Sequence, residues 1–182
     1  VNYEVDKKGK LIATVDLPEN IKGTFVWKGQ NYPLVSGHQA FTINQQASAG
    51  QRKYYVSSST GDDSNDGLTP KRAFKTLAKA SQLRLFPGDS LLLRAGDIWL
   101  KESLFPVGSG RPENPIVISS YGKGARPHIK PGHDAIYGIR IVNDAGYKIK
   151  GLEVSDCYGG IVVWEENTYN HEYIWIEDCY FH

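Results

Sequence analysis

A short apolar pattern occurs twice near the end of the sequence, at a separation that limits which folds are open to the chain. Three apolar residues recur at one constant offset: Ile149 is matched by Ile176, Leu152 by Cys179, and Val154 by Phe181. A period in the twenties that carries strands and no helix is typical of a β-solenoid, in which each turn buries its apolar face against the next. A hairpin-rich β-sandwich with accidental matches is the alternative.

Strand-like segments also fill the sequence upstream of this repeat. The 182 residues include 19 Gly, 9 Pro, 11 Tyr, 6 Phe and 4 Trp, which is typical of strand-rich proteins with many turns. No helical periodicity appears after residue 89, and the β-favouring runs there are Ser90–Arg94, Pro115–Ser119, Pro127–Lys130, Gly138–Val142, Lys148–Val154, Gly160–Trp164 and Tyr173–Ile176. We therefore predict an all-β fold.

Two segments before residue 89 have a different character. Residues 1–47 are predicted to form a small antiparallel β module, with strands at Lys10–Leu17, Gly23–Trp27, Asn31–Leu34 and Gln39–Ile43. Residues 48–52 are predicted as a linker because the surrounding stretch is polar and small. An amphipathic helix is expected from Pro70 to Arg84, because Thr69 and Pro70 favour a helix start and apolar residues recur at helical spacing.

The segment from Tyr54 to Gly96 resembles the N-terminal start of secreted right-handed parallel β-helix proteins of the pectin-lyase-like superfamily. The matching pieces are Tyr54–Ser57, Gly61–Gly67, Thr69-Pro70, Phe74–Ala80, Pro87–Asp89 and Leu93–Gly96. The resemblance continues through Gly108–Ile118 and Arg126–Ile129, and covers residues 53–182. It implies an incomplete right-handed parallel β-helix whose open N-terminal end is covered by a capping α-helix, with the small β module in front.

This resemblance also sets expectations for partners and location. Since the sequence stops partway through a coil, we expect the remainder of a longer β-helix, or another chain, to cover the C-terminal open end. The superfamily implies a polysaccharide partner and a secreted or cell-surface protein. The absence of Met from this chain implies that it begins after a processing site or a boundary, without its signal peptide, and the absence of glycosylation sequons favours a bacterial source.

The charge balance argues against other classes of partner. The chain has 21 Lys and Arg against 20 Asp and Glu, so it lacks the massed positive charge of a general nucleic-acid or membrane-surface binder. No apolar run approaches the roughly 18 residues that span a bilayer. We expect neither a nucleic-acid partner nor a membrane.

The repeat places chemically active side chains in rows on an outer face. Residues one period apart in stacked parallel strands lie about 4.8 Å apart. The register therefore places Lys148 over Trp175, Lys150 over Glu177, Glu153 over Tyr180, and Ser155 over His182. Aromatic rings beside charged side chains suit a polysaccharide that lies across the strands. The candidate substrate-binding residues are Lys150, Trp164, Trp175, Tyr180 and His182.

Glycoside hydrolysis is the favoured activity. It needs two carboxylates that flank the scissile bond, and the local candidates are Glu153, Asp156, Glu177 and Asp178. A hydrolase of this kind requires no cofactor. Ordinary solvated charges on an outer face are the competing interpretation of each of these residues, and the family resemblance leaves room for an active site beyond residue 182.

Two alternatives remain open. A polysaccharide lyase would cut uronate glycans by β-elimination, with a base such as Lys148, Lys150, Arg140 or His182 and a cation that neutralises the uronate. A non-catalytic glycan-binding or adhesion protein is the other alternative. We rank the hydrolase first because the outer face offers carboxylates and aromatics but no Arg cluster.

A calcium ion is the one metal that the sequence suggests. Asp62–Gly67 resembles the start of a calcium loop, so Asp62 and Asp66 are the candidate ligands. The Glu expected at position twelve is Ala73, which argues against an EF-hand and favours a turn held by side-chain hydrogen bonds. Cys157 and Cys179 are expected to be free thiols.

Overall fold

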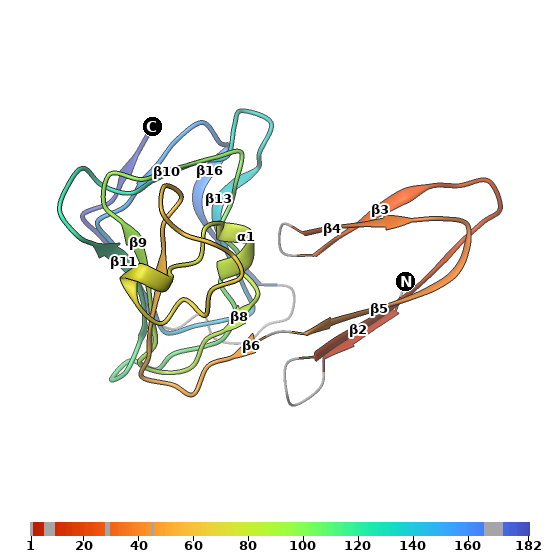
Figure 1. Cartoon of the computed structure of the whole chain (residues 1–182), viewed down its shortest axis with the longest axis horizontal. Helices are drawn as coiled ribbons and strands as arrows, with labels where there is room; N and C mark the ends of the chain where they lie inside the picture. Colours follow the sequence, from red (N-terminus) through yellow and green to blue (C-terminus); the bar gives the residue numbers. More distant parts are fainter. Residues whose placement is uncertain (1, 6–9, 28–29, 45, 166–172) are drawn as a thin grey trace.

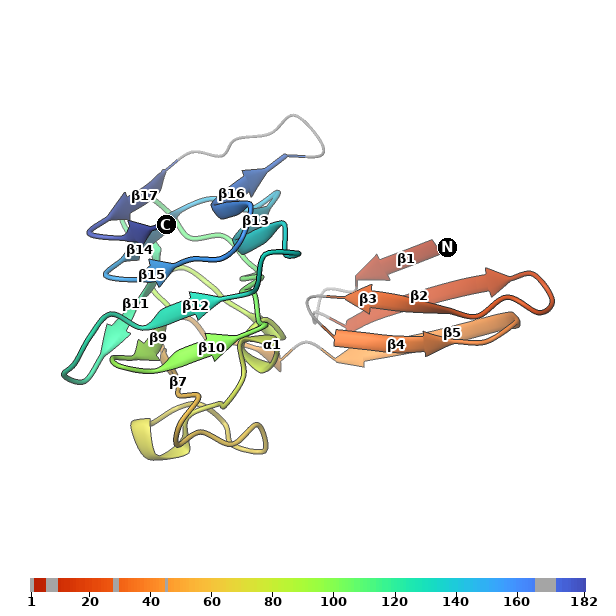
Figure 2. The same ribbon diagram turned by 90° about the horizontal axis from the view of Figure 1, so that it is seen from above.

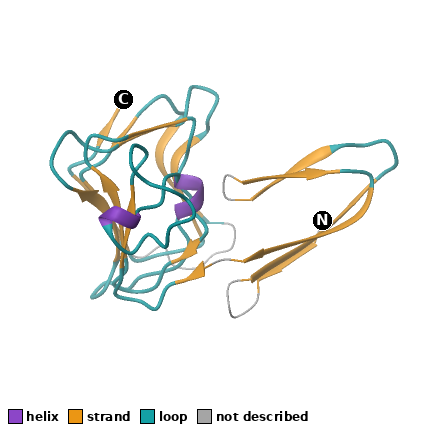
Figure 3. Cartoon of the chain, in the orientation of Figure 1, coloured by secondary structure: helices purple, strands orange, loops and turns teal. Residues whose placement is uncertain are grey.

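The computed structural model describes residues 2–5, 10–27, 30–44, 46–165 and 173–182. Strands make up most of its regular structure, which confirms the all-β prediction (Figure 3). The pairs before residue 45 are antiparallel, whereas the later strands pair in parallel. The sheets are therefore mixed within one chain.

The described residues before position 45 form the antiparallel strands, which extend to one side of the rest of the chain (Figures 1 and 2). One sheet has the order β1-β2-β5, and β3 pairs with β4. The bounds are β1 (Asn2–Val5), β2 (Lys10–Leu17), β3 (Gly23–Trp27), β4 (Gln30–Leu34) and β5 (Gly37–Asn44). All four predicted strands are present, because alternate apolar residues such as Leu11, Ala13 and Val15 can be buried on one face of β2.

The chain after β5 is hydrogen-bonded to the parallel part. β6 (Gln46–Ala47) pairs in parallel with β8 (Leu83–Arg84), and the Ser48 amide donates to the Arg84 carbonyl at 2.9 Å. The Arg52 amide donates to the buried Asp89 carboxylate at 2.9 Å. The division into 1–47, 48–52 and 53–182 stays a prediction.

The five-stranded sheet is parallel throughout and has the order β17-β14-β11-β9-β7. Its members are β7 (Lys53–Val56), β9 (Ser90–Arg94), β11 (Ile116–Tyr121), β14 (Tyr147–Lys150) and β17 (Ile174–Glu177). Ile149 pairs with Ile176, so the register predicted from the repeat is confirmed. The spacing between paired residues is longer for the preceding strands: Val117 of β11 pairs with Lys148 of β14.

Two smaller parallel sheets run beside this one and are stacked in the same direction (Figure 2). The four-stranded sheet contains β10 (Ile98–Leu100), β12 (His128–Lys130), β15 (Glu153–Val154) and β18 (Tyr180–Phe181). Its pairs join Ile98 to His128, His128 to Glu153, and Glu153 to Tyr180. The third sheet pairs β13 (Tyr137–Val142) with β16 (Gly159–Trp164), and Tyr137 lies opposite Gly159, which is a shorter step along the sequence.

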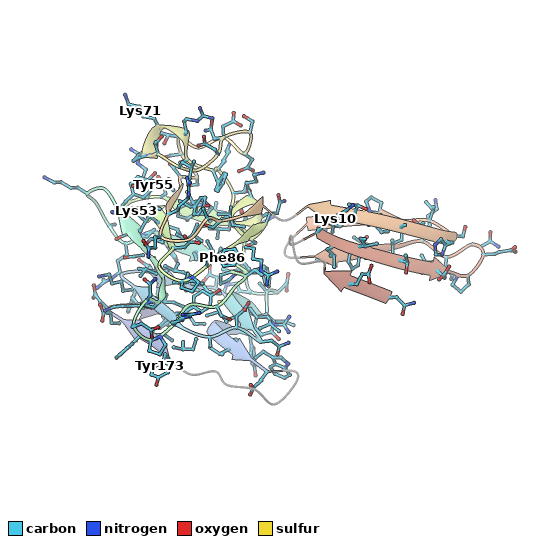
Figure 4. All side chains as sticks on the ribbon, turned by 90° about the horizontal axis from the view of Figure 1, so that it is seen from below. Lys10, Lys53, Tyr55, Lys71, Phe86 and Tyr173 are labelled. Carbon is cyan, nitrogen blue, oxygen red and sulfur yellow. The ribbon has the colours of Figure 1, made fainter. Side chains whose placement is uncertain are left out.

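The core lies between the five-stranded sheet, the four-stranded sheet and the β13–β16 sheet, where inward-facing residues form columns. Paired strands of the five-stranded sheet contribute Leu91, Ile118 and Ile149, all fully buried. The four-stranded sheet adds Trp99, Ile129 and Val154, and the third sheet adds Ile139 and Ile141. Cys157 and Cys179 are unpaired, as predicted, and pack against this core. Side chains fill the space between the ribbons, with Lys71 and Tyr173 at opposite ends of the stack (Figure 4).

The chain turns from the five-stranded sheet into the four-stranded sheet at a residue in the left-handed backbone conformation. Gly96, Gly151 and Asp178 have φ values of 84°, 68° and 50°, and each lies just before a strand of the four-stranded sheet. Glycine adopts this conformation without steric cost, and Asp is among the few other residues that tolerate it. The same corner therefore leads into β10, β15 and β18.

The predicted helix from Pro70 to Arg84 is wrong. The described residues contain a short 3-10 helix, η1 (Pro70–Arg72), and one α-helical turn, α1 (Leu77–Ala80), before β8 begins at Leu83. None of the helices described is long and apolar enough to cross a membrane.

Hydrogen bonds to neighbouring segments explain why the helix does not form. Phe74 bridges to Val56 as an extended residue, and the amides of Lys75 and Thr76 donate to the Asp63 carboxylate at 2.8 and 3.0 Å. These bonds use the amide groups that a continuous helix would need. Phe74 and Leu77 still reach the core, Phe74 from an extended segment and Leu77 from the single turn α1.

The prediction of a right-handed parallel β-helix with a capping α-helix is also corrected. Parallel sheets are present, yet the described residues show neither a closed solenoid nor a helical cap. The repeat predicted which strands pair, whereas the predicted cap needed a long helix that the described residues do not contain.

We predict that Ile149→Ala lowers the free energy of unfolding by about 2–5 kcal/mol, because it opens a cavity in a fully buried column. Urea denaturation measures the change. The control Lys150→Ala, at the exposed neighbouring position, should change stability by about 0.5 kcal/mol or less. Equal midpoints for the two variants would contradict the assigned register.

Candidate functional site

The candidate site lies on the outer face of the four-stranded parallel sheet. Backbone pairing aligns His128 in β12 with Glu153 in β15 and Tyr180 in β18. Ile129 and Val154, which follow the first two, are buried in the core. Since side chains alternate along a strand, the aligned residues face outward as one row.

His182 closes one side of this row. It lies one position beyond β18, and its backbone amide donates to the Val154 carbonyl at 3.3 Å. Its Nε2 is 3.0 Å from Oε1 of Glu153. Its ring stacks on Tyr180 with the centroids 4.7 Å apart, so the imidazole is held from two directions.

His128 approaches the same carboxylate from the neighbouring strand. Its Nδ1 lies 3.6 Å from Oε1 of Glu153, and its Nε2 lies 2.7 Å from Oγ of Ser155. We call His128, Glu153 and His182 the His–Glu–His cluster. One nitrogen or oxygen atom of each residue lies within 4.8 Å of the others, and this is the one group of three such metal-binding side chains found in the part of the chain that the structure describes.

The cluster favours a deprotonated Glu153. The hydrogen bond from His182 lowers the pKa of the Glu153 carboxyl, against a smaller opposing effect of burial. Charges on His128, His182 and Arg126 lower it further. A carboxylate of this kind suits a base, a nucleophile or a cation ligand, whereas a glycosidase general acid needs a raised pKa.

Asp156 lies next to the cluster and has its own cationic partners. Nζ of Lys130 is 3.1 Å from Oδ2, and Nε2 of His133 is 4.0 Å from Oδ1. The hydrogen bond from Lys130 is the main cause of a lowered pKa for Asp156, and burial opposes it. This second carboxylate therefore also favours the charged form.

The remaining predicted catalytic residues are engaged elsewhere. Asp178 pairs with Arg126 at the corner before β18. Glu177 belongs to the five-stranded sheet, where its Oε2 lies 3.1 Å from Nζ of Lys148. The structure thus brings Glu153 and Asp156 to one face and places Glu177 on another.

The predicted substrate-binding residues are also divided among the sheets. Tyr180 and His182 belong to the candidate site. Lys150 and Trp175 lie on the five-stranded sheet, where the Trp175 residue is 56% exposed. Trp164 ends β16 of the third sheet. The predicted row of Lys148 and Trp175 is confirmed by backbone pairing, but it is a different row from that of Glu153 and Tyr180.

Sequence reasoning missed His128. Its partner Glu153 follows it by less than one period of the repeat, so that period does not align the two. The available signal was a polar residue followed by a buried apolar one, in His128–Ile129 and again in Glu153–Val154. It can be recognised once the spacing between strands is allowed to vary.

Asp62 and Asp66 take part in turn hydrogen bonds. Oδ1 of Asp62 accepts from the amide and hydroxyl of Ser64 at 2.8 and 2.7 Å. Oδ1 of Asp66 accepts from the Leu68 amide at 3.0 Å, and its Oδ2 lies 3.1 Å from Arg72. These bonds match the turn interpretation, and calcium binding by the two residues stays a prediction.

No known family profile matches the sequence, but curated proteins do. A segment of 72 residues is 40% identical to the lacto-N-biosidase of Bifidobacterium longum, which covers 38% of this chain and 4% of that protein. A segment of 71 residues is 32% identical to alpha-1,3-galactosidase A of Akkermansia muciniphila, which covers 39% of this chain and 12% of that protein.

Two solved structures of the GH136 lacto-N-biosidase from Eubacterium ramulus are also similar. The native protein gives a TM-score of 0.52 at 29% identity, covering 60% of this chain and 21% of that one. The selenomethionine derivative gives 0.54 at 27% identity, covering 70% and 23%. The match thus spans less than a quarter of the solved chains.

These comparisons correct the resemblance to the pectin-lyase-like superfamily. The similar proteins point to GH136 lacto-N-biosidase-like proteins and not specifically to that superfamily. Their names are those of glycosidases, so the lyase alternative gains no support.

We predict that Glu153 titrates below the ordinary Glu range and that His182→Ala moves its pKa upward. Because the folded-state pKa is lowered, the interaction stabilises the fold above the ordinary Glu pKa and is lost as the pH falls through the lowered value. NMR titration of side-chain carboxyl carbons measures both values. The control His133→Ala should leave Glu153 unchanged, and equal shifts in both variants would contradict the prediction.

Proposed function

We propose that the chain is part of a glycoside hydrolase that acts on an extracellular glycan. The main support is similarity to lacto-N-biosidases, with 40% identity over 72 residues in one and a TM-score of 0.54 to another. Because the matched segments span so little of those proteins, the proposal concerns the protein to which this chain contributes. The relatives' names suggest lacto-N-biose or α-1,3-linked galactose as the released group.

The outer face of the four-stranded sheet is the proposed contact surface for the glycan. Tyr180 is 54% exposed and offers a ring against which a sugar can pack. Glu153 and Asp156 are proposed as carboxylates that act in the charged form, as base or nucleophile. Because both have lowered pKa values, the general acid of such a reaction is a different residue.

A further polypeptide segment is the proposed partner at the β17 and β18 edge. Ile176 and Phe181 continue the columns of Ile149 and Val154, yet they are 44% and 43% exposed. An additional strand pair, from the same protein or from another chain, would bury these apolar residues as the preceding strands bury theirs. Secretion of the protein is part of the same proposal and rests on the bacterial relatives.

The test of the hydrolase is release of sugar from a panel of glycans that includes substrates ending in lacto-N-biose or α-1,3-linked galactose. We expect release by the protein that contains this chain, and a fall of about 10²–10⁴-fold in Glu153→Gln. The control Glu113→Gln, at an exposed position outside the described strands, should retain full activity. Release unaffected by Glu153→Gln would remove the catalytic role from this face.

A non-catalytic glycan-binding protein is the second candidate, favoured by the exposed Trp175 beside the Lys148 and Glu177 pair. It predicts retention on an immobilised glycan without sugar release. Trp175→Ala should then lower retention at least 10-fold, because burial of a large apolar side chain contributes about 1.5–3 kcal/mol. Tyr158→Ala, at an exposed aromatic outside the five-stranded sheet, is the matched control. Sugar release from the same glycan would exclude this candidate.

A further inference from the structure

We propose that His128, Glu153 and His182 form a binding site for a divalent transition metal ion, with zinc as the best match. Each ligand comes from or directly follows a different strand, and the three strands are adjacent in one parallel sheet. The proposal concerns metal binding only and does not depend on the proposed glycan activity.

The distances between the side chains suit such an ion. Zinc binds imidazole nitrogen and carboxylate oxygen at about 2.0–2.2 Å, so two ligand atoms of a tetrahedral site lie about 3.3–3.6 Å apart. The Glu153 oxygen lies 3.0 Å from Nε2 of His182 and 3.6 Å from Nδ1 of His128. All three candidate ligand atoms lie within 4.8 Å of one another, so small side-chain rotations bring them around one point.

The ligand types select among metals. Two imidazoles and one carboxylate suit zinc and its neighbours in the transition series, whereas calcium prefers six to eight oxygen ligands. Three protein ligands leave a fourth tetrahedral position for water or another oxygen ligand. The side chains of His182 and Glu153 are 46% and 25% exposed, so solvent can reach that position.

Neighbouring side chains already orient both imidazoles. Metal-binding histidines commonly hydrogen-bond through the second ring nitrogen, which fixes the ring and its tautomer. Nε2 of His128 has this contact with Oγ of the buried Ser155 at 2.7 Å, and its Nδ1 is left facing Glu153. The ring of His182 is stacked on Tyr180. An ordinary exposed ion pair needs none of these constraints.

The test is zinc titration of the full chain after removal of metals with a chelator. Calorimetry should show one zinc ion per chain, and thermal denaturation should show a higher midpoint with zinc. Cobalt used in its place should give the intense visible absorption of a tetrahedral site. His128→Ala and His182→Ala should each weaken zinc binding at least 10-fold, and Ser155→Ala should weaken it roughly 10-fold.

Three control variants separate this site from other metal ligands. His133 lies beside the cluster but is not part of it, so His133→Ala should bind zinc normally. The double variant Cys157→Ser, Cys179→Ser removes both free thiols and should also bind normally. Asp62→Ala should have no effect on zinc. The proposal is overturned if zinc does not bind below about millimolar concentration, if the cysteine variant loses binding, or if calcium binds more tightly than zinc at the cluster.

Discussion

In-register pairing of parallel strands is the interaction on which the rest of this structure depends. The inward-facing backbone pairs of the five-stranded sheet place one apolar side chain over another, as Ile118, Ile149 and Ile176 show. The same pairing in the four-stranded sheet places His128, Glu153 and Tyr180 in a row on the outside. A slip of one position would exchange the two faces, so the core and the candidate site are determined by the same register.

Buried carboxylates hold the loops that join these strands. Asp97 accepts hydrogen bonds from the hydroxyls of Ser57 and Ser59, both at 2.7 Å. Burial alone would raise the pKa of Asp97, but the hydrogen bonds and the charge of Arg94 outweigh it and the pKa is lowered. Asp89 similarly accepts amide bonds at the turn before β9. These side chains replace the hydrogen bonds that loop backbone cannot make within a sheet.

The sequence predicted strand pairing better than it predicted the connections. The pairing of Ile149 with Ile176 could be predicted because apolar residues that recur at a constant spacing indicate strands that face one core. The helix predicted around Phe74 does not form, because amides of this segment bond instead to backbone and carboxylate groups outside it. For the site, Glu153, Tyr180 and His182 followed from the period. His128 did not, because the loop before Glu153 changes the spacing. The family resemblance pointed to a different superfamily from the lacto-N-biosidases that proved similar.

The unequal spacing between paired strands has an evolutionary consequence. In the third parallel sheet Tyr137 pairs with Gly159, whereas in the five-stranded sheet Val117 pairs with Lys148, a longer step along the chain. The steps also differ from one pair to the next within the four-stranded sheet. Connections of unequal length therefore join the paired strands without disturbing the hydrogen bonds that hold them. A scaffold of this kind can acquire new surface loops, and with them new specificities, while the framework beneath stays the same.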